Sequence, residues 1–200
     1  SAITMTTGNI FAIRQTNIKR FLAFSSITQA GYILIGVASA SDQSMASVIY
    51  FLLIYAFSNI GAFTVVSLIS DRTGKENIDD YKGLYKTNPL LSIGLLLAVF
   101  SLAGIPPTAG FFGKLFLLTS GASAGLITLI IIASLNMIIS LYYYLRIIKT
   151  MFVDNNETPI EKFISDTPAK IALVICVAGI LVAGFINFIF EYIHSLSFGL

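Results

Sequence analysis

One lysine stands out as a candidate for chemistry because of where it lies in the sequence. Lys114 is the only charged residue of the long apolar segment Leu90–Leu118. A lysine at membrane depth costs about 2.5–3.5 kcal/mol on insertion scales, so such a residue is a candidate functional group. A buried amine can take up and release a proton, which is the chemistry that a proton path requires. We therefore interpret Lys114 as the centre of a proton path.

The residues just before Lys114 predict an interruption of the helix. They read Gly-Ile-Pro-Pro-Thr-Ala-Gly over positions 104–110. Proline has no backbone N–H and clashes with the preceding turn, and glycine adds backbone freedom. We expect a discontinuous helix that is broken around Gly104, Pro106, Pro107 and Gly110. Irregular backbone at this depth is tolerated where it is buried in protein or lines a wet cavity, and transporters use such breaks at ion sites.

A simpler interpretation of the same residues stays open. The two prolines would then form an ordinary kink, and the side chain of Lys114 would extend along the helix to the outer surface. This is feasible because Gly121 is only seven residues further on. Since the predicted break and the only intramembrane charge occur together, we carry the proton-path interpretation forward.

Neutral polar residues in the other apolar segments are weaker candidates. Tyr55 and Asn59 lie one turn apart on one face of a predicted helix, and Asn136 shares a face with Ser140. We include Tyr55, Asn59 and Asn136 in the predicted proton path, although such residues also serve as hydrogen-bond partners between helices. The first apolar segment carries a further polar group, made up of Ser25, Ser26, Thr28, Gln29 and Tyr32.

Three consecutive tyrosines, Tyr142, Tyr143 and Tyr144, precede the basic residues Arg146 and Lys149. Tyrosines followed by basic residues are typical of the aromatic belt at the cytoplasmic surface of a membrane. We expect these tyrosines to anchor the helix at that surface.

The composition indicates that membrane helices carry these residues. Apolar residues make up 56% of the chain and charged residues 11%, whereas a soluble domain has about 25% charged residues. A bilayer core needs about 20 mostly apolar residues per helix. Five segments meet this requirement, namely Phe21–Ala38, Ala46–Ile69, Leu90–Leu118, Leu126–Ile148 and Ala169–Phe190. We interpret residues 1–13 as the end of a truncated sixth helix, and the chain as a fragment.

Basic residues alternate between the connections. The connections 14–20, 70–89 and 146–170 carry three, four and four Lys or Arg residues, whereas 39–45, 119–125 and the tail after Glu191 carry none. The positive-inside rule places the basic connections in the cytoplasm and the C-terminus outside. The polar segment Asp71–Asn88 is too long for a tight turn, so we expect it to lie along the cytoplasmic face.

Several classes of function are excluded by residue content. The chain has one cysteine, Cys176, and one histidine, His194, so it lacks the residues for a disulfide within the chain or for a zinc, iron–sulfur or haem site. Cys176 lies in an apolar run, where it is most simply a packed small hydrophobe. No nucleic-acid partner is expected, because the orientation of membrane segments explains the basic residues. The N-terminus also lacks the basic region of a signal peptide.

Several stretches resemble one family of membrane proteins. They are residues 14–26 (RQTNIKRFLAFSS), 29–32 (QAGY), 79–85 (DDYKGLY), 101–114 (SLAGIPPTAGFFGK) and 140–146 (SLYYYLR). In this order they resemble the antiporter-like membrane subunits, above all subunit N, of the proton-pumping NADH:quinone oxidoreductase, respiratory complex I. The resemblance covers most of residues 1–150, and the remaining tail is only generically similar.

The resemblance implies an all-α polytopic membrane fold, since the family is built around two inverted five-helix repeats. Residues 1–148 resemble the second repeat, with its first helix truncated and helix 90–118 discontinuous. A cytoplasmic connection (149–168) and a terminal transmembrane helix with an external tail (169–200) would follow. Lys114 matches the family's lysine on the broken helix, which belongs to the half-channel leading to the outside, and the break at Pro106 and Pro107 matches as well.

The sequence departs from the family pattern in two ways. Sister subunits tend to carry His and Lys on the helix equivalent to Ala46–Ile69, where this chain has Tyr55 and Asn59. This favours subunit N and weakens a proton role for those two positions. The first repeat is absent, so no residue here stands for the family's lysine–glutamate pair or its central lysine.

The expected function is that of a membrane subunit of NADH:quinone oxidoreductase, a translocase, contributing a proton half-channel coupled to electron transfer elsewhere. The resemblance places NADH, FMN, iron–sulfur clusters and quinone in partner subunits, with no cofactor and no redox chemistry in this chain. Its partners would be the other membrane subunits of complex I and the lipid bilayer, in the inner (plasma) membrane of a bacterium rather than an organelle. Two alternatives stay open, a subunit of a multisubunit cation/proton antiporter and a non-conducting structural scaffold.

Overall fold

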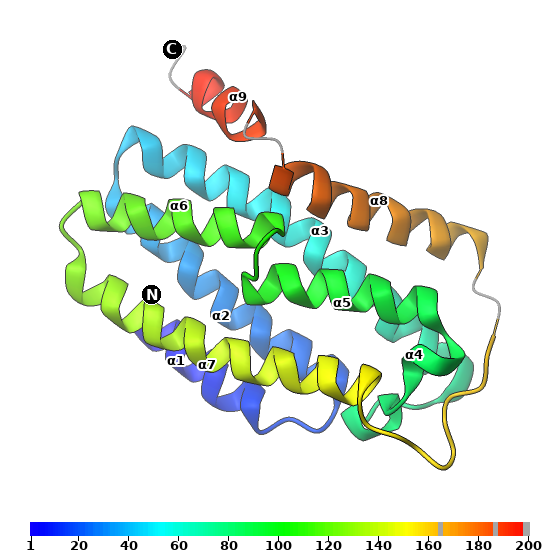
Figure 1. The fold of residues 1–200 in the computed structure, drawn as a ribbon. Helices are drawn as coiled ribbons and strands as arrows, with labels where there is room; N and C mark the ends of the chain where they lie inside the picture. Colours follow the sequence, from blue (N-terminus) through cyan, green and yellow to red (C-terminus); the bar gives the residue numbers. More distant parts are fainter. Residues whose placement is uncertain (164–165, 186–187, 198–200) are drawn as a thin grey trace.

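The computed structural model describes residues 1–163, 166–185 and 188–197. In this part of the chain the long helices run side by side as a bundle (Figure 1). In chain order the helices are α1 (Ala2–Ile13), α2 (Ile18–Ser39), α3 (Asp42–Thr73), η1 (Ile78–Tyr81), α4 (Leu84–Thr87), α5 (Pro89–Ala103), α6 (Ala109–Ser123), α7 (Ile127–Phe152), α8 (Thr167–Phe185) and α9 (Phe188–Ser197). The expected all-α fold class is confirmed.

Four of the described helices are long and apolar enough to cross a membrane, namely α2, α3, α7 and α8. The expected crossing Leu90–Leu118 is made instead by two shorter helices, α5 and α6, which lie end to end (Figure 1). The connection 104–108 separates them. The discontinuous helix therefore occurs where the prolines and glycines predict it.

The boundaries of α3 differ from the expected span Ala46–Ile69 because caps determine where a helix begins and ends. Ser41 and Ser44 form a capping box, in which each side-chain oxygen accepts a hydrogen bond from the backbone N–H of the other residue. At the other end, Gly74 has a φ of 69°, the left-handed conformation that commonly ends a helix. The helix is therefore longer than the apolar segment at both ends.

The last expected crossing, Ala169–Phe190, corresponds to α8, which ends at Phe185, and to the first residues of α9, which begins at Phe188. Residues 186–187 lie outside the described residues. The expected external tail is in part helical, since α9 extends to Ser197, and residues 198–200 lie outside the described residues.

The three basic connections lie at one end of the bundle and contact one another. The Ile18 N–H donates to the Glu76 carbonyl (2.8 Å), which joins the first to the second. The Gly83 N–H donates to the Thr150 carbonyl (3.1 Å), which joins the second to the end of α7. Figure 1 places the connections without Lys or Arg, between α2 and α3 and between α6 and α7, at the opposite end. The alternation of charge therefore predicts correctly which connections share an end.

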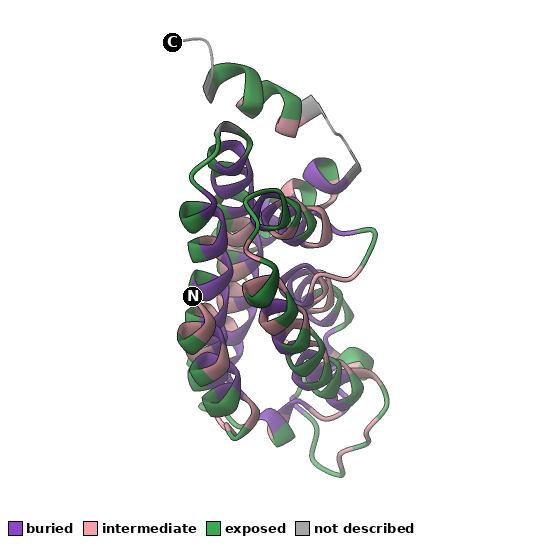
Figure 2. Cartoon of the chain, turned by 90° about the vertical axis from the view of Figure 1, so that its left-hand side faces the viewer, coloured by how far each residue is buried: buried purple, intermediate pink, exposed green. Residues whose placement is uncertain are grey.

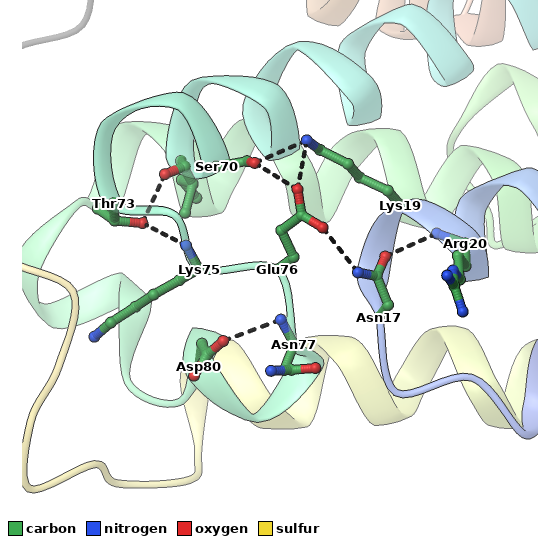
Figure 3. Close-up of polar contacts among 10 residues, drawn as sticks. Asn17, Lys19, Arg20, Ser70, Thr73, Lys75, Glu76, Asn77 and Asp80 are labelled. Atoms are coloured by element: carbon green, nitrogen blue, oxygen red, sulfur yellow. Dashed lines mark hydrogen bonds and ion pairs between the residues drawn. The ribbon is translucent and has the colours of Figure 1, made fainter.

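The Glu76 carboxylate fastens two of these connections together (Figure 3). It accepts hydrogen bonds from Lys19 Nζ (2.8 Å), Asn17 Nδ2 (2.9 Å) and Ser70 Oγ (2.8 Å). The bond from Lys19 is the largest of the effects that lower the pKa of Glu76 to about 2. The carboxylate thus stays ionised and holds connection 14–20 against the end of α3.

Burial separates the inner from the outer faces of the helices (Figure 2). On α7, Ile131, Leu135 and Ile138 are 57%, 57% and 64% exposed, and their spacing places them on one stripe. Several polar side chains lie inside instead, Gln29 and Lys114 among them. An apolar exterior around a partly polar interior is what a bundle in a lipid bilayer requires.

Candidate functional site

The side chain of Lys114 lies inside the bundle with 1% of its surface exposed. It extends from the second turn of α6 to the last turn of α5. There its Nζ donates to the carbonyl oxygens of Leu102 (2.7 Å) and Ala103 (3.2 Å). Nζ also lies 5.0 Å from the centre of the Tyr32 ring, within cation–π range. The alternative in which this side chain reaches the outer surface is therefore wrong.

The break in the helix creates the acceptors that hold Lys114. Gly104 has a φ of 82° and ends α5 in the left-handed conformation. The N–H groups of Gly104 and Ile105 bond back to carbonyls of the preceding turn. Because α5 does not continue, the carbonyls of Leu102 and Ala103 have no helical donor. The partial negative charge at this helix end also favours a cation.

The other predicted break residues all lie at the break. Pro106 and Pro107 fall within the connection between α5 and α6, and Gly110 is the second residue of α6. A Cβ added to Gly110 would lie 1.8 Å from the carbonyl oxygen of Ser101. The start of α6 therefore packs directly on the end of α5, at a distance that only glycine permits.

A second polar side chain reaches the same helix end from α2. Gln29 Nε2 donates to the Leu102 carbonyl (3.0 Å) and to the Tyr144 hydroxyl (3.2 Å). The Tyr144 hydroxyl also shares a hydrogen bond with the Ser25 hydroxyl. All of these groups are buried. A connected polar group therefore runs from Lys114 across α2 to α7.

Another buried polar group joins α1, α2 and α7. Asn9 Nδ2 donates to Asn136 Oδ1 (2.8 Å), and Asn9 Oδ1 accepts from the hydroxyls of Tyr143 (2.8 Å) and Thr28 (3.2 Å). The rings of Tyr143 and Tyr144 have centroids 4.7 Å apart, so the two groups are neighbours. Asn136, a predicted path residue, is thus part of the polar interior.

The anchoring role expected for the three tyrosines is wrong for two of them. Tyr142 faces outward and is 63% exposed, but Tyr143 and Tyr144 are 2% and 0% exposed. Successive residues of a helix point about 100° apart, so one run of tyrosines is divided between an outer and an inner face. The inner face of α7 packs against α1, α2 and α5.

Tyr55 and Asn59 stay predictions as path residues. Both are half-buried on α3, and the Tyr55 ring stacks on that of Phe51 with centroids 6.5 Å apart. Within the described residues, no hydrogen bond joins either of them to Lys114 or Gln29.

Sequence reasoning left three contacting residues out of the path, Gln29, Tyr144 and Asn9. The sequence does carry one indication for Gln29. Ser25 and Gln29 are four residues apart, so they place two polar side chains on the same face of one helix. Tyr144 was hidden by its position in the tyrosine run. Asn9 lies in the segment interpreted as a truncated helix, where it gave no signal.

Comparisons of sequence place the chain among known proteins. The family model described as NADH:quinone oxidoreductase/Mrp antiporter, TM, matches residues 1–140. The sequence is 50% identical over 193 residues to NADH-quinone oxidoreductase subunit N of Phocaeicola vulgatus, which covers 96% of this chain and 41% of that protein. The chain thus spans about two fifths of the length of such curated relatives.

Two solved structures are also similar. One is a chain of respiratory complex I from Thermus thermophilus with bound aureothin, which is 32% identical, with a TM-score of 0.79 over 92% of this chain and 41% of that chain. The other is a chain of the Mrp complex from Dietzia sp., which is 24% identical, with a TM-score of 0.86 over 98% of this chain and 45% of that chain. The second likeness shows a shared fold.

Proposed function

Because the chain belongs to the NADH:quinone oxidoreductase/Mrp antiporter transmembrane family, we propose that it is part of a membrane subunit of NADH:quinone oxidoreductase and carries a proton half-channel. The observation that carries the proposal is the site of Lys114, which is 1% exposed and bound to two carbonyls at a helix break. The similarity to a protein named NADH-quinone oxidoreductase subunit N supports NADH:quinone oxidoreductase over a cation/proton antiporter as the assembly.

Lys114 is suited to proton exchange because no carboxylate of residues 1–163, 166–185 or 188–197 pairs with it and holds it in its charged state. The ion pairs of the described residues involve Lys19, Arg72, Lys82 and Lys149, all at the basic end of the bundle. A buried carboxylate partner would make loss of the proton costly. Carbonyl oxygens are neutral, so they orient the amine without fixing its charge.

The buried polar groups supply a route for the proton. From Lys114 the route passes Gln29 and Tyr144, and it continues through the neighbouring group that contains Asn9 and Asn136. Hydroxyl and amide groups can relay protons together with water. In this proposal, Tyr55 and Asn59 line the route on α3 and carry no charge.

The proposal extends to location, regions and partners. The other membrane subunits of complex I and the lipid bilayer are the partners, and NADH, FMN, iron–sulfur clusters and quinone are bound by partner subunits. The protein is multi-pass in the plasma membrane of a bacterium, with its basic connections in the cytoplasm. Residues 1–148 form the antiporter-like repeat, 149–168 the cytoplasmic connection, and 169–200 the terminal helix and external tail.

The test replaces Lys114 in the intact complex, reconstituted in proteoliposomes. With Lys114→Met we expect proton pumping per NADH oxidised to fall, because the group that exchanges the proton is gone. Lys114→Arg should fail as well, since a guanidinium does not give up its proton in a protein. Lys86→Met is the control, because Lys86 lies outside the spans and bonds to Asn155 Oδ1 (2.6 Å).

Two outcomes would favour the alternatives. Unchanged turnover and unchanged pumping in Lys114→Met would favour a non-conducting scaffold. Purification of the chain with cation-transporting subunits, and without those that oxidise NADH, would favour the antiporter. A chain of the Mrp complex has the same fold.

A further inference from the structure

An apolar groove runs along the outside of the bundle between α5 and α8. Its volume is about 510 Å³, and its walls include Leu91 and Gly94 from α5 and Leu173 and Val177 from α8. It opens to the surroundings of the bundle, because the lining residue Val174 is 66% exposed. The groove lies outside the polar interior that contains Lys114, so what it binds is independent of the proposed proton route.

One charged residue lines the groove, and it stands at one end. Lys170 lies in the first turn of α8, whereas the other lining residues are apolar. The carboxylate nearest in sequence, Asp166, lies just before α8 and is already paired with Arg72 at 2.6 Å. Lys170 takes part in none of the ion pairs found among the described residues. The groove therefore combines an apolar wall with a cation at its mouth that forms no ion pair with any residue the structure describes.

The length of the groove matches one leaflet of a bilayer. Its lining on α8 extends from Ala169 to Leu181, which is twelve residues further on. At 1.5 Å per residue this is about 18 Å, and half of the hydrocarbon core of a bilayer is about 15 Å. Lys170 lies at the basic end of the bundle, so it stands near the level of the lipid headgroups.

The dimensions distinguish between two kinds of occupant. A helix segment about 10 Å across and 18 Å long fills roughly 1,400 Å³, more than twice the groove volume of about 510 Å³, so a helix of a neighbouring subunit would cover the groove without entering it. A single extended hydrocarbon chain is far smaller in cross-section than a helix, so it is the occupant that this volume suits. We propose that this groove binds an acyl chain of an anionic phospholipid, whose headgroup phosphate contacts Lys170.

The test uses the intact complex in phosphatidylcholine vesicles that contain a small fraction of phosphatidylglycerol with a photoreactive acyl chain. Labelled peptides are identified by mass spectrometry, and phosphatidylcholine with the same photoreactive chain serves as the comparison. We expect labelling within 90–94 and 170–181 to be about fivefold stronger with phosphatidylglycerol, as one lysine near the membrane surface predicts. Lys170→Gln should abolish this difference, and Lys162→Gln, an exposed lysine that does not line the groove, should leave it.

A second pair of variants tests the acyl-chain site. Ala178→Phe places a ring in the groove and should remove labelling by both lipids, whereas Ile175→Phe, exposed on another side of α8, should not. Equal labelling by the two lipids would show an unselective lipid layer and overturn the proposal. Crosslinks to a neighbouring subunit in place of lipid would also overturn it. If Ala178→Phe does not assemble, the comparison of Lys170→Gln with Lys162→Gln decides.

Discussion

Gln29 and Lys114 donate hydrogen bonds to the same acceptor, the carbonyl oxygen of Leu102, at 3.0 and 2.7 Å. One donor comes from α2 and the other from α6, so three helices meet at a single atom of α5. Within the described residues, the amide oxygen of Gln29 is buried and has no hydrogen-bond partner. This oxygen can therefore accept a hydrogen bond from a donor that reaches the site, such as a water molecule.

A carboxylate at position 29 should hold the amine in its charged state. We expect Gln29→Glu to slow proton pumping by the intact complex about tenfold, the effect of about 1.4 kcal/mol of extra stabilisation of the ammonium. Gln29→Met removes the hydrogen bond to Leu102 without adding charge, so its effect should be smaller. Proton uptake into proteoliposomes measures both, and wild-type pumping by Gln29→Glu would contradict the prediction.

Gly104→Ala should affect proton transfer beyond its effect on folding. A side chain in the left-handed conformation costs about 1–2 kcal/mol, and the new Cβ would lie 3.0 Å from Lys114 Cδ. Gly125→Ala is a matched control, because Gly125 has a φ of 77° and an added Cβ would meet no atom of the described residues within 4 Å. Both variants should lower the thermal stability of the complex similarly. Only Gly104→Ala should reduce pumping, and equal pumping by the two would refute a positioning role.

Gly110→Ala should prevent α5 and α6 from packing end to end. The added Cβ would lie 1.8 Å from the backbone oxygen of Ser101, which cannot move aside as a flexible side chain would. We expect a loss of stability of about 3 kcal/mol or more, seen as less assembled complex on a native gel. In Gly61→Ala the new Cβ would be 3.2 Å from Cys176 Cβ, so this control should assemble nearly normally.

The Glu76 cluster should stabilise the basic end of the bundle in a way that depends on pH. Hydrogen bonds, first that of Lys19, lower the pKa of Glu76 from 4.5 to about 2 in the folded protein. The contribution is therefore complete above pH about 4.5 and is lost as the pH falls toward 2. Glu76→Gln should remove it at neutral pH and abolish this part of the pH dependence.

Proteolysis of the connections between pH 2 and 7 measures the effect at Glu76. Glu157→Gln is the control, because Glu157 is exposed and lies in another connection. The same pH dependence in wild type and Glu76→Gln would show that the cluster does not hold these connections together.

Local signals were enough to predict the main features of the fold. The alternation of basic connections depends only on charge along the chain, and the break around Pro106 depends only on the backbone properties of proline and glycine. Helix ends were predicted less well. The capping box of Ser41 and Ser44 extends α3 beyond its apolar segment, and hydropathy does not report caps.

The centre of the site could be predicted, but its surroundings could not. Lys114 stands out because a charge in an apolar segment is visible in the sequence. Its neighbour Gln29 is 73 residues from Leu102 and 115 residues from Tyr144, so their meeting depends on how distant helices pack. The same packing decides which of Tyr142 and Tyr143 faces inward, and local patterns along the sequence do not show it.

In the proposed proton exchange, the two carbonyls at the end of α5 determine the side of Lys114 Nζ from which the proton leaves. A lysine ammonium has three N–H bonds, and the carbonyls of Leu102 and Ala103 occupy two of them. After the proton leaves, the neutral amine can keep both bonds while its lone pair takes the third position. The proton therefore leaves from and returns to the same third position, on the side of the nitrogen turned away from the interrupted helix.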